Sequence, residues 1–162
     1  MIKSSVLLLY SFLILLMGCQ SSTQSTLNKK TIGDICYEVN SISKELLQQN
    51  DSNEIADLYY FKLTIYEVKN NNKIQELFNQ INYNKLLFYA NTRIKNDITL
   101  TIGELIKTPL QIHFENNNRV SNKLVFMIAF EKEITTNNSE VLLSFNDNIF
   151  NNGILNFRFN AI

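Results

Sequence analysis

The chain of 162 residues contains one proline, four glycines, two cysteines and no tryptophan. So little proline and glycine excludes collagen-like and linker-dominated chains, and two cysteines are too few for a disulfide-rich scaffold. Fifteen basic residues balance fifteen acidic ones, so the formal net charge is zero and no overall field attracts nucleic acid. The 45% apolar content excludes a disordered chain, and the length fits one compact domain.

The first residues form a short apolar segment with a positive charge before it. Lys3 precedes a run from Val6 to Met17 that is apolar except at Ser11. A helix of about twelve residues rises about 18 Å, which is less than the roughly 30 Å hydrocarbon core of a bilayer. This length is typical of the apolar region of a signal peptide and is short for a transmembrane helix.

The sequence Leu16-Met17-Gly18-Cys19 resembles the lipobox of bacterial lipoproteins, in which an aliphatic residue lies three places before a cysteine and a small residue directly before it. The resemblance implies a signal peptide over residues 1–18, cleavage between Gly18 and Cys19, and a diacylglycerol and an N-acyl chain on Cys19. Gln20 follows where lipoproteins of the inner membrane carry Asp, so the same resemblance implies an outer-membrane anchor facing the periplasm. The alternative is an ordinary secretory signal whose cysteine is incidental.

A polar segment separates this leader from the body of the chain. Residues from Gln20 to Thr26 include no apolar side chain, so they have nothing to bury. We expect residues 19–30 to form the lipidated end and a flexible tether with a reach of about 15–20 Å. Residues 31–162 are expected to form a single globular β-rich domain.

Two helices are expected in that domain. Thr31 followed by Asp34 resembles an N-cap pair. Apolar residues at three- and four-residue steps then predict an amphipathic helix over residues 33–49: Ile32, Ile35, Val39, Ile42 and Leu46. A second apolar face predicts a short crossover helix over residues 73–81: Ile74, Leu77, Phe78 and Ile81.

Most of the remaining sequence is typical of strands. Alternating apolar residues and short apolar runs predict strands at residues 59–66, 86–89, 98–102, 110–114, 124–130, 141–145 and 155–159, the fifth of them central and covered on both faces. Many of the 24 asparagines lie between these runs, where they favour turns. About seven short strands predict an antiparallel β-sandwich with an N-terminal amphipathic helix and a short crossover helix.

The sequence offers few groups for catalysis. His113, the one histidine, shares a strand face with Glu115, and the two are the candidate acid–base pair. Zinc needs three or four ligands, so no metal site is expected, and no cofactor beyond the acyl groups. Cys36 is the thiol that remains once Cys19 is lipidated. We expect it to be a small buried side chain, the alternative being an intermolecular disulfide.

Three functions remain open at this point. The first is a lipid-anchored cell-envelope protein that acts as a non-enzymatic interaction or scaffold module, with the membrane and an envelope protein as partners and no nucleic acid. The second is a carbohydrate- or small-ligand-binding lipoprotein, in which Tyr60, Tyr66 and turn asparagines contact the ligand or partner. The third is an envelope enzyme that uses His113 and Glu115.

Overall fold

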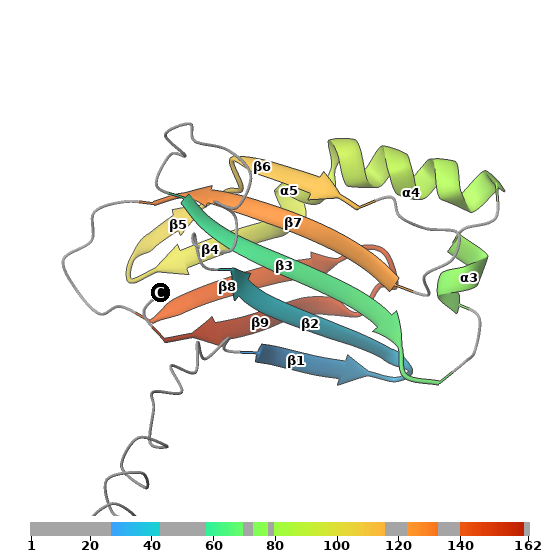
Figure 1. Ribbon diagram of the computed structural model, residues 1–162, viewed down its shortest axis with the longest axis horizontal. Coiled ribbons are helices and arrows are strands. Elements are labelled where there is room, and N and C mark those ends of the chain that lie inside the picture. The colour runs from blue at the N-terminus through green and yellow to red at the C-terminus, as the bar shows by residue number, and fades with distance from the viewer. Residues whose placement is uncertain are drawn as a thin grey trace, which may run out of the picture.

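The computed structural model of the protein describes residues 27–42, 58–69, 73–77, 80–115, 123–132 and 140–160. Within these ranges the chain forms two antiparallel sheets that face each other across a shared apolar core, with short helices at one side (Figure 1). The predicted mainly β, sandwich-like architecture is therefore confirmed.

The first sheet, sheet A, has five strands. They are β1 (Leu27–Ile32), β2 (Ile35–Ile42), β3 (Leu58–Glu67), β7 (Lys123–Glu131) and β6 (Gln111–Phe114), in this spatial order. The period-two alternation predicted for residues 59–66 is confirmed, because Tyr59, Phe61, Leu63 and Ile65 are buried in the core. The predicted strand 124–130 is interior, as expected, but β3 and not β7 is the middle strand.

The second sheet, sheet B, has four strands. They are β5 (Leu105–Lys107), β4 (Ile98–Ile102), β8 (Val141–Asp147) and β9 (Gly153–Phe159), in this spatial order. Strands β4, β8 and β9 match the predicted strands at 98–102, 141–145 and 155–159. Each buries alternate residues against sheet A, so one face of the sheet is apolar and the other faces outward.

Aromatic side chains from both sheets meet in the core. The ring centroid of Phe61 on β3 lies 5.9 Å from that of Phe130 on β7 and 5.2 Å from that of Phe159 on β9. The sheets also meet at the edge where β1 lies beside β9, because the Asn28 side-chain amide donates to the carbonyl of Arg158 at 2.5 Å. This contact closes one side of the sandwich.

The helices lie away from the edge where β1 meets β9. They are α3 (Lys73–Leu77), α4 (Gln80–Thr92) and α5 (Ile94–Asp97). Helix α4 lies next to β6, α3 contacts β3, and α5 contacts β8 and β4 (Figure 1). Leu86, Ala90 and Ile94 follow one another at four-residue steps and are buried in the core. Leu86 and Ala90 share one face of α4, which packs on the sandwich together with Ile94 of α5, while the opposite face of α4 points to solvent.

The predicted N-terminal helix over residues 33–49 is wrong for every residue of it that the structure describes. Residues 35–42 form β2, which pairs with β1 through a hairpin in which Ile32 lies opposite Ile35. Gly33 has φ +58°, the left-handed conformation that a two-residue hairpin loop beginning with glycine requires. Residues 43–49 lie outside the described residues. Residues 27–30, which the sequence placed at the end of the tether, belong to β1, and residues 19–26 lie outside the described residues.

Two expectations around residue 80 also need correction. The predicted strand at residues 86–89 is wrong, because these residues lie in the middle of α4. The crossover helix predicted over 73–81 is present in part. It ends at Leu77 as α3, and a separate helix begins at Gln80. The strand predicted at 110–114 is confirmed as β6.

Candidate functional site

The lipobox residues Gly18 and Cys19 lie outside the described residues, and the described chain begins at Leu27 of β1. Among the described residues, no helix combines the length and the apolar character that crossing a bilayer requires. The lipidation site therefore remains a prediction of the sequence.

The two tyrosines predicted to contact a ligand or partner both lie on the outer face of sheet A, since they alternate with the buried residues of β3. Both are half-buried. Tyr60 and Tyr66 are six residues apart on one strand, which corresponds to about 20 Å. The structure does not bring them together into one small-ligand site.

Tyr66 is already surrounded by other side chains of sheet A. The ammonium groups of Lys29 and Lys123 lie 5.5 and 5.2 Å from its ring centroid, and its hydroxyl donates to Glu38 Oε2 at 3.4 Å. The hydrogen bond with Cys36 is the largest of the effects that raise the pKa of Tyr66 above its ordinary value. Because two cations occupy its ring, Tyr66 has little free surface on which a sugar could stack.

The candidate thiol and the candidate acid–base pair are far apart. Cys36 is a free cysteine with no exposed surface, as the sequence predicted, although it lies on a strand and not on a helix. His113 is exposed on β6, and β3 and β7 separate that strand from β2, so His113 and Cys36 are about 14 Å apart or more. Glu115, the partner proposed for His113, follows β6 and donates its backbone N–H to Val125. Across the described ranges, no three His, Cys, Asp or Glu side chains group closely enough to hold a metal ion.

A buried carboxylate that the sequence did not single out organises the turn between β8 and β9. Asp147 is 1% exposed, and its side chain accepts hydrogen bonds from the backbone N–H groups of Ile149, Phe150 and Asn152. The Tyr37 hydroxyl donates to its Oδ2 at 2.5 Å. Burial first, and this hydrogen bond second, raise the pKa of Tyr37 above its ordinary value. The carboxylate is fully paired, so its role is to hold the turn.

A second carboxylate joins the same turn to helix α4. Asp97 at the end of α5 accepts a hydrogen bond from the Tyr89 hydroxyl at 2.8 Å and another from the Asn148 side-chain amide at 2.8 Å. Burial raises the pKa of Tyr89 above its ordinary value, and the hydrogen bond to Asp97 raises it further. Tyr89 is therefore a neutral donor at physiological pH, fixed in position over the turn.

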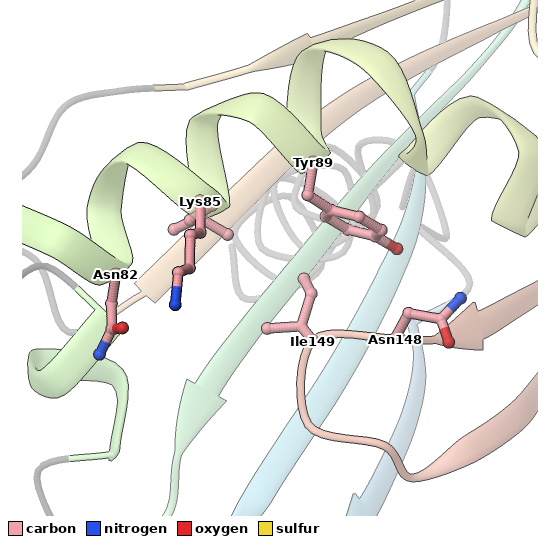
Figure 2. A pocket seen from close by; sticks show the side chains of 6 residues that line it. Asn82, Lys85, Tyr89, Asn148 and Ile149 are labelled. Atoms are coloured by element: carbon pink, nitrogen blue, oxygen red, sulfur yellow. The ribbon is translucent and has the colours of Figure 1, made fainter.

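Between α4 and the β8–β9 turn lies a pocket of about 280 Å³, and this is the candidate functional site. It is lined by Asn82, Lys85, Leu86, Tyr89, Asn148 and Ile149. Figure 2 shows the Tyr89 side chain directed from the helix toward the turn that carries Asn148 and Ile149, with Asn82 and Lys85 farther along the same helix. Leu86 and Ile149 supply apolar surface, and Lys85 is the charged side chain of the lining.

The pocket and the start of the described chain lie at opposite ends of β9. Asn28 contacts the carbonyl of Arg158 near the end of that strand, whereas the turn that lines the pocket precedes its first residue, Gly153. Five residues of strand correspond to about 17 Å. The chain thus enters the domain at one end of the sandwich and presents the pocket toward the other (Figure 1).

Comparison with protein-family models, with curated proteins and with solved structures finds no match to this chain.

Proposed function

We propose that this protein is a lipid-anchored module of the bacterial cell envelope that binds a partner through the end of the domain farthest from its anchor. The resemblance of Leu16 to Cys19 to a lipobox supports the anchor, and Gln20 supports an outer membrane with the domain facing the periplasm. The observation that carries the proposal is the separation of the chain entry, at β1, from the pocket and helix α4.

The anchor would hold the domain close to a membrane. Residues 20–26 lie between Cys19 and the first strand, and a flexible segment of that length spans about 15 Å. Several acyl chains on Cys19 hold a protein firmly, because each buried CH₂ contributes about 0.8 kcal/mol. The entry end of the sandwich then lies near the lipid, and the α4 end is presented to partners.

Helix α4 offers a surface suited to protein contact. Phe88, on its solvent side, is 57% exposed, and the guanidinium of Arg93 lies 5.7 Å from the Phe88 ring centroid. An aromatic residue beside an arginine is a composition enriched at protein–protein interfaces. Concentration of the domain on a membrane would raise the effective concentration of this surface for a partner held on the same membrane.

Two experiments test this function in separate steps. Metabolic labelling with an alkyne fatty acid is expected to mark the protein in cells and to fail for Cys19→Ala, whereas Cys36→Ala should label normally. Labelling of Cys19→Ala at the normal level would show that the anchor is not at this cysteine.

The second experiment locates the partner surface. A photoreactive p-benzoylphenylalanine at position 88 of the full chain is expected to give a cross-linked product of defined mass in cells. The matched control is the same group at position 156, an exposed site on the outer face of sheet B. Equal cross-linking at both positions, or none at position 88, would contradict a partner surface on α4.

A second candidate function, small-ligand binding, is favoured by the pocket between α4 and the β8–β9 turn. Its apolar surface and its few convergent polar groups are typical of a small-molecule site. A ligand screen with the full chain, read by resonances of Tyr89 and Ile149, tests this function independently of the lipid anchor. In this candidate the pocket takes the ligand-binding role that the sequence suggested for Tyr60 and Tyr66.

A further inference from the structure

The lining of the pocket between α4 and the β8–β9 turn carries a positive charge and no negative one. Lys85 is exposed, and within the described residues its ammonium group forms no ion pair or hydrogen bond. It is also the one charged residue of the lining. A cation beside apolar surface recognises an anionic group on a ligand that has an apolar body.

The neighbouring carboxylate limits how much negative charge the ligand can carry. Both oxygens of Asp97 accept hydrogen bonds from groups at the pocket, the Tyr89 hydroxyl and the Asn148 amide. The Tyr89 hydroxyl and one N–H of the Asn148 amide are therefore engaged with the protein, and the charge of Asp97 remains close to both. A dianionic phosphate would meet one free cation and this repulsion, whereas a monoanionic carboxylate needs only Lys85.

The apolar part of the pocket sets the size of the ligand. Leu86 and Ile149 line the pocket from facing elements, and the Tyr89 ring lies beside Ile149 (Figure 2). A volume of about 280 Å³ lies just below the usual range for ligand pockets, so it suits a body the size of one leucine or phenylalanine side chain.

From these observations we infer that the pocket binds a carboxylate attached to a compact apolar group, with the carboxylate on Lys85 and the apolar group between Leu86 and Ile149. The inference rests on the second candidate function, small-ligand binding, and not on the lipid anchor. Such a group occurs at the C-terminal residue of a polypeptide and in free small acids, and the two sources share this chemistry.

The test measures binding of paired probes to the full chain in lipid nanodiscs by ligand-observed NMR, with empty nanodiscs as the blank. N-acetyl-leucine carries the carboxylate, and N-acetyl-leucinamide has the same body without the charge. We expect the acid to bind about tenfold more tightly than the amide, because a charged hydrogen bond is lost in the amide. N-acetyl-alanine should bind more weakly than N-acetyl-leucine, since it buries fewer methylene groups.

Variants assign these differences to the pocket. Lys85→Gln should bring the acid and the amide to nearly equal affinity, and Lys85→Arg should keep most of the preference. Lys62→Gln, on the outer face of sheet A, is the matched control and should behave as the unmodified protein. Ile149→Ala should reduce the advantage of the leucine probe over the alanine probe, because it removes one apolar wall.

The outcomes distinguish the preference for a carboxylate from small-ligand binding itself. Equal binding of acid and amide to the unmodified protein would overturn carboxylate recognition but leave a small-ligand site. No binding of either probe at about 10 mM would overturn both. A tetrapeptide ending in leucine that binds at least as tightly as N-acetyl-leucine assigns the site to polypeptide C-termini, and one that binds tenfold more weakly assigns it to free acids.

Discussion

The hydrogen bond between Tyr37 and Asp147 offers the sharpest prediction of stability. Tyr37 is fully buried and Asp147 is 1% exposed, so neither group can exchange its partner for water. Tyr37→Phe removes the hydroxyl that donates to Asp147 Oδ2 and also accepts from the Asn152 side-chain amide at 2.7 Å. The carboxylate keeps its three backbone donors, so the turn should remain formed.

The expected loss follows from the kind of bond that is removed. A hydrogen bond to a charged group contributes about 1.5–3 kcal/mol, and we expect Tyr37→Phe to lower the free energy of unfolding by about 2 kcal/mol. Asp147→Ala should cost more, about 3–5 kcal/mol, because it leaves a buried hydroxyl and three backbone N–H groups without their acceptor. In the double variant the losses should not add, because both changes break the same bond.

Urea unfolding followed by circular dichroism measures these differences. Tyr60→Phe is the matched control, since Tyr60 is half-buried and its hydroxyl forms no hydrogen bond within the described residues, and its effect should stay within about 0.5 kcal/mol. If Tyr37→Phe unfolded at the same urea concentration as Tyr60→Phe, the buried bond would contribute nothing and the reasoning would be refuted.

Three further predictions concern single residues. Burial raises the pKa values of Tyr37 and Tyr89 above the ordinary value of 10.0, so the protonated forms stabilise the fold. The contribution of each tyrosine to stability should be constant below pH 10.0 and fall above it by about 1.4 kcal/mol per pH unit; titration of both tyrosines in the folded protein near pH 10.0 would contradict this. The Cys36 thiol should react with a maleimide only as fast as the protein unfolds, since it is fully buried; rapid labelling of Cys19→Ala in native buffer would disprove it. Gly33→Ala should cost about 1 kcal/mol in urea unfolding and Gly33→Asn less, because the φ of +58° penalises a side chain while nothing lies within 4 Å of an added Cβ; equal costs would exclude backbone strain as the cause.

Strands with strict alternation could be predicted from the sequence. In β4, apolar residues and threonines alternate along the whole element, and in β3 the core residues Tyr59, Phe61, Leu63 and Ile65 recur at every second position, which places them on one face of a strand. The turn before Gly153 was predictable for a local reason, because Asn151 adopts φ 59° and asparagine tolerates this conformation.

The helix predicted near the N-terminus is wrong because the apolar residues there fit both the helical and the strand period. Ile35 and Val39 are four residues apart, as on a helix, but with Tyr37 between them they also alternate as on a strand. The hairpin signal was Gly33-Asp34 between two β-branched residues, and its short loop brings β1 and β2 together. Pairing with β3 over the whole length of β2 then stabilises the strand and not the helix.

The run at residues 86–89 was misread for the opposite reason. Four adjacent apolar residues fit a short buried strand as well as one turn of a buried helix, and length decides between them. Leu86, Ala90 and Ile94 at four-residue steps extend past the run, and this longer pattern is the helical one. The wider window would have predicted α4 and, with it, the helical wall of the pocket.

The pocket itself could not be predicted, because its two walls are more than fifty residues apart in the chain and are joined through hydrogen bonds to Asp97, which is only partly buried. Asp147 fixes the β8–β9 turn by accepting hydrogen bonds from three of its backbone N–H groups, and Asp97 holds the same turn by accepting one from the Asn148 side chain. Asp97 also orients Tyr89 on the helical wall. A site whose rim is fixed from both sides in this way loses little conformational entropy when a ligand binds, so recognition can rest on one free cation, Lys85, and a small apolar surface.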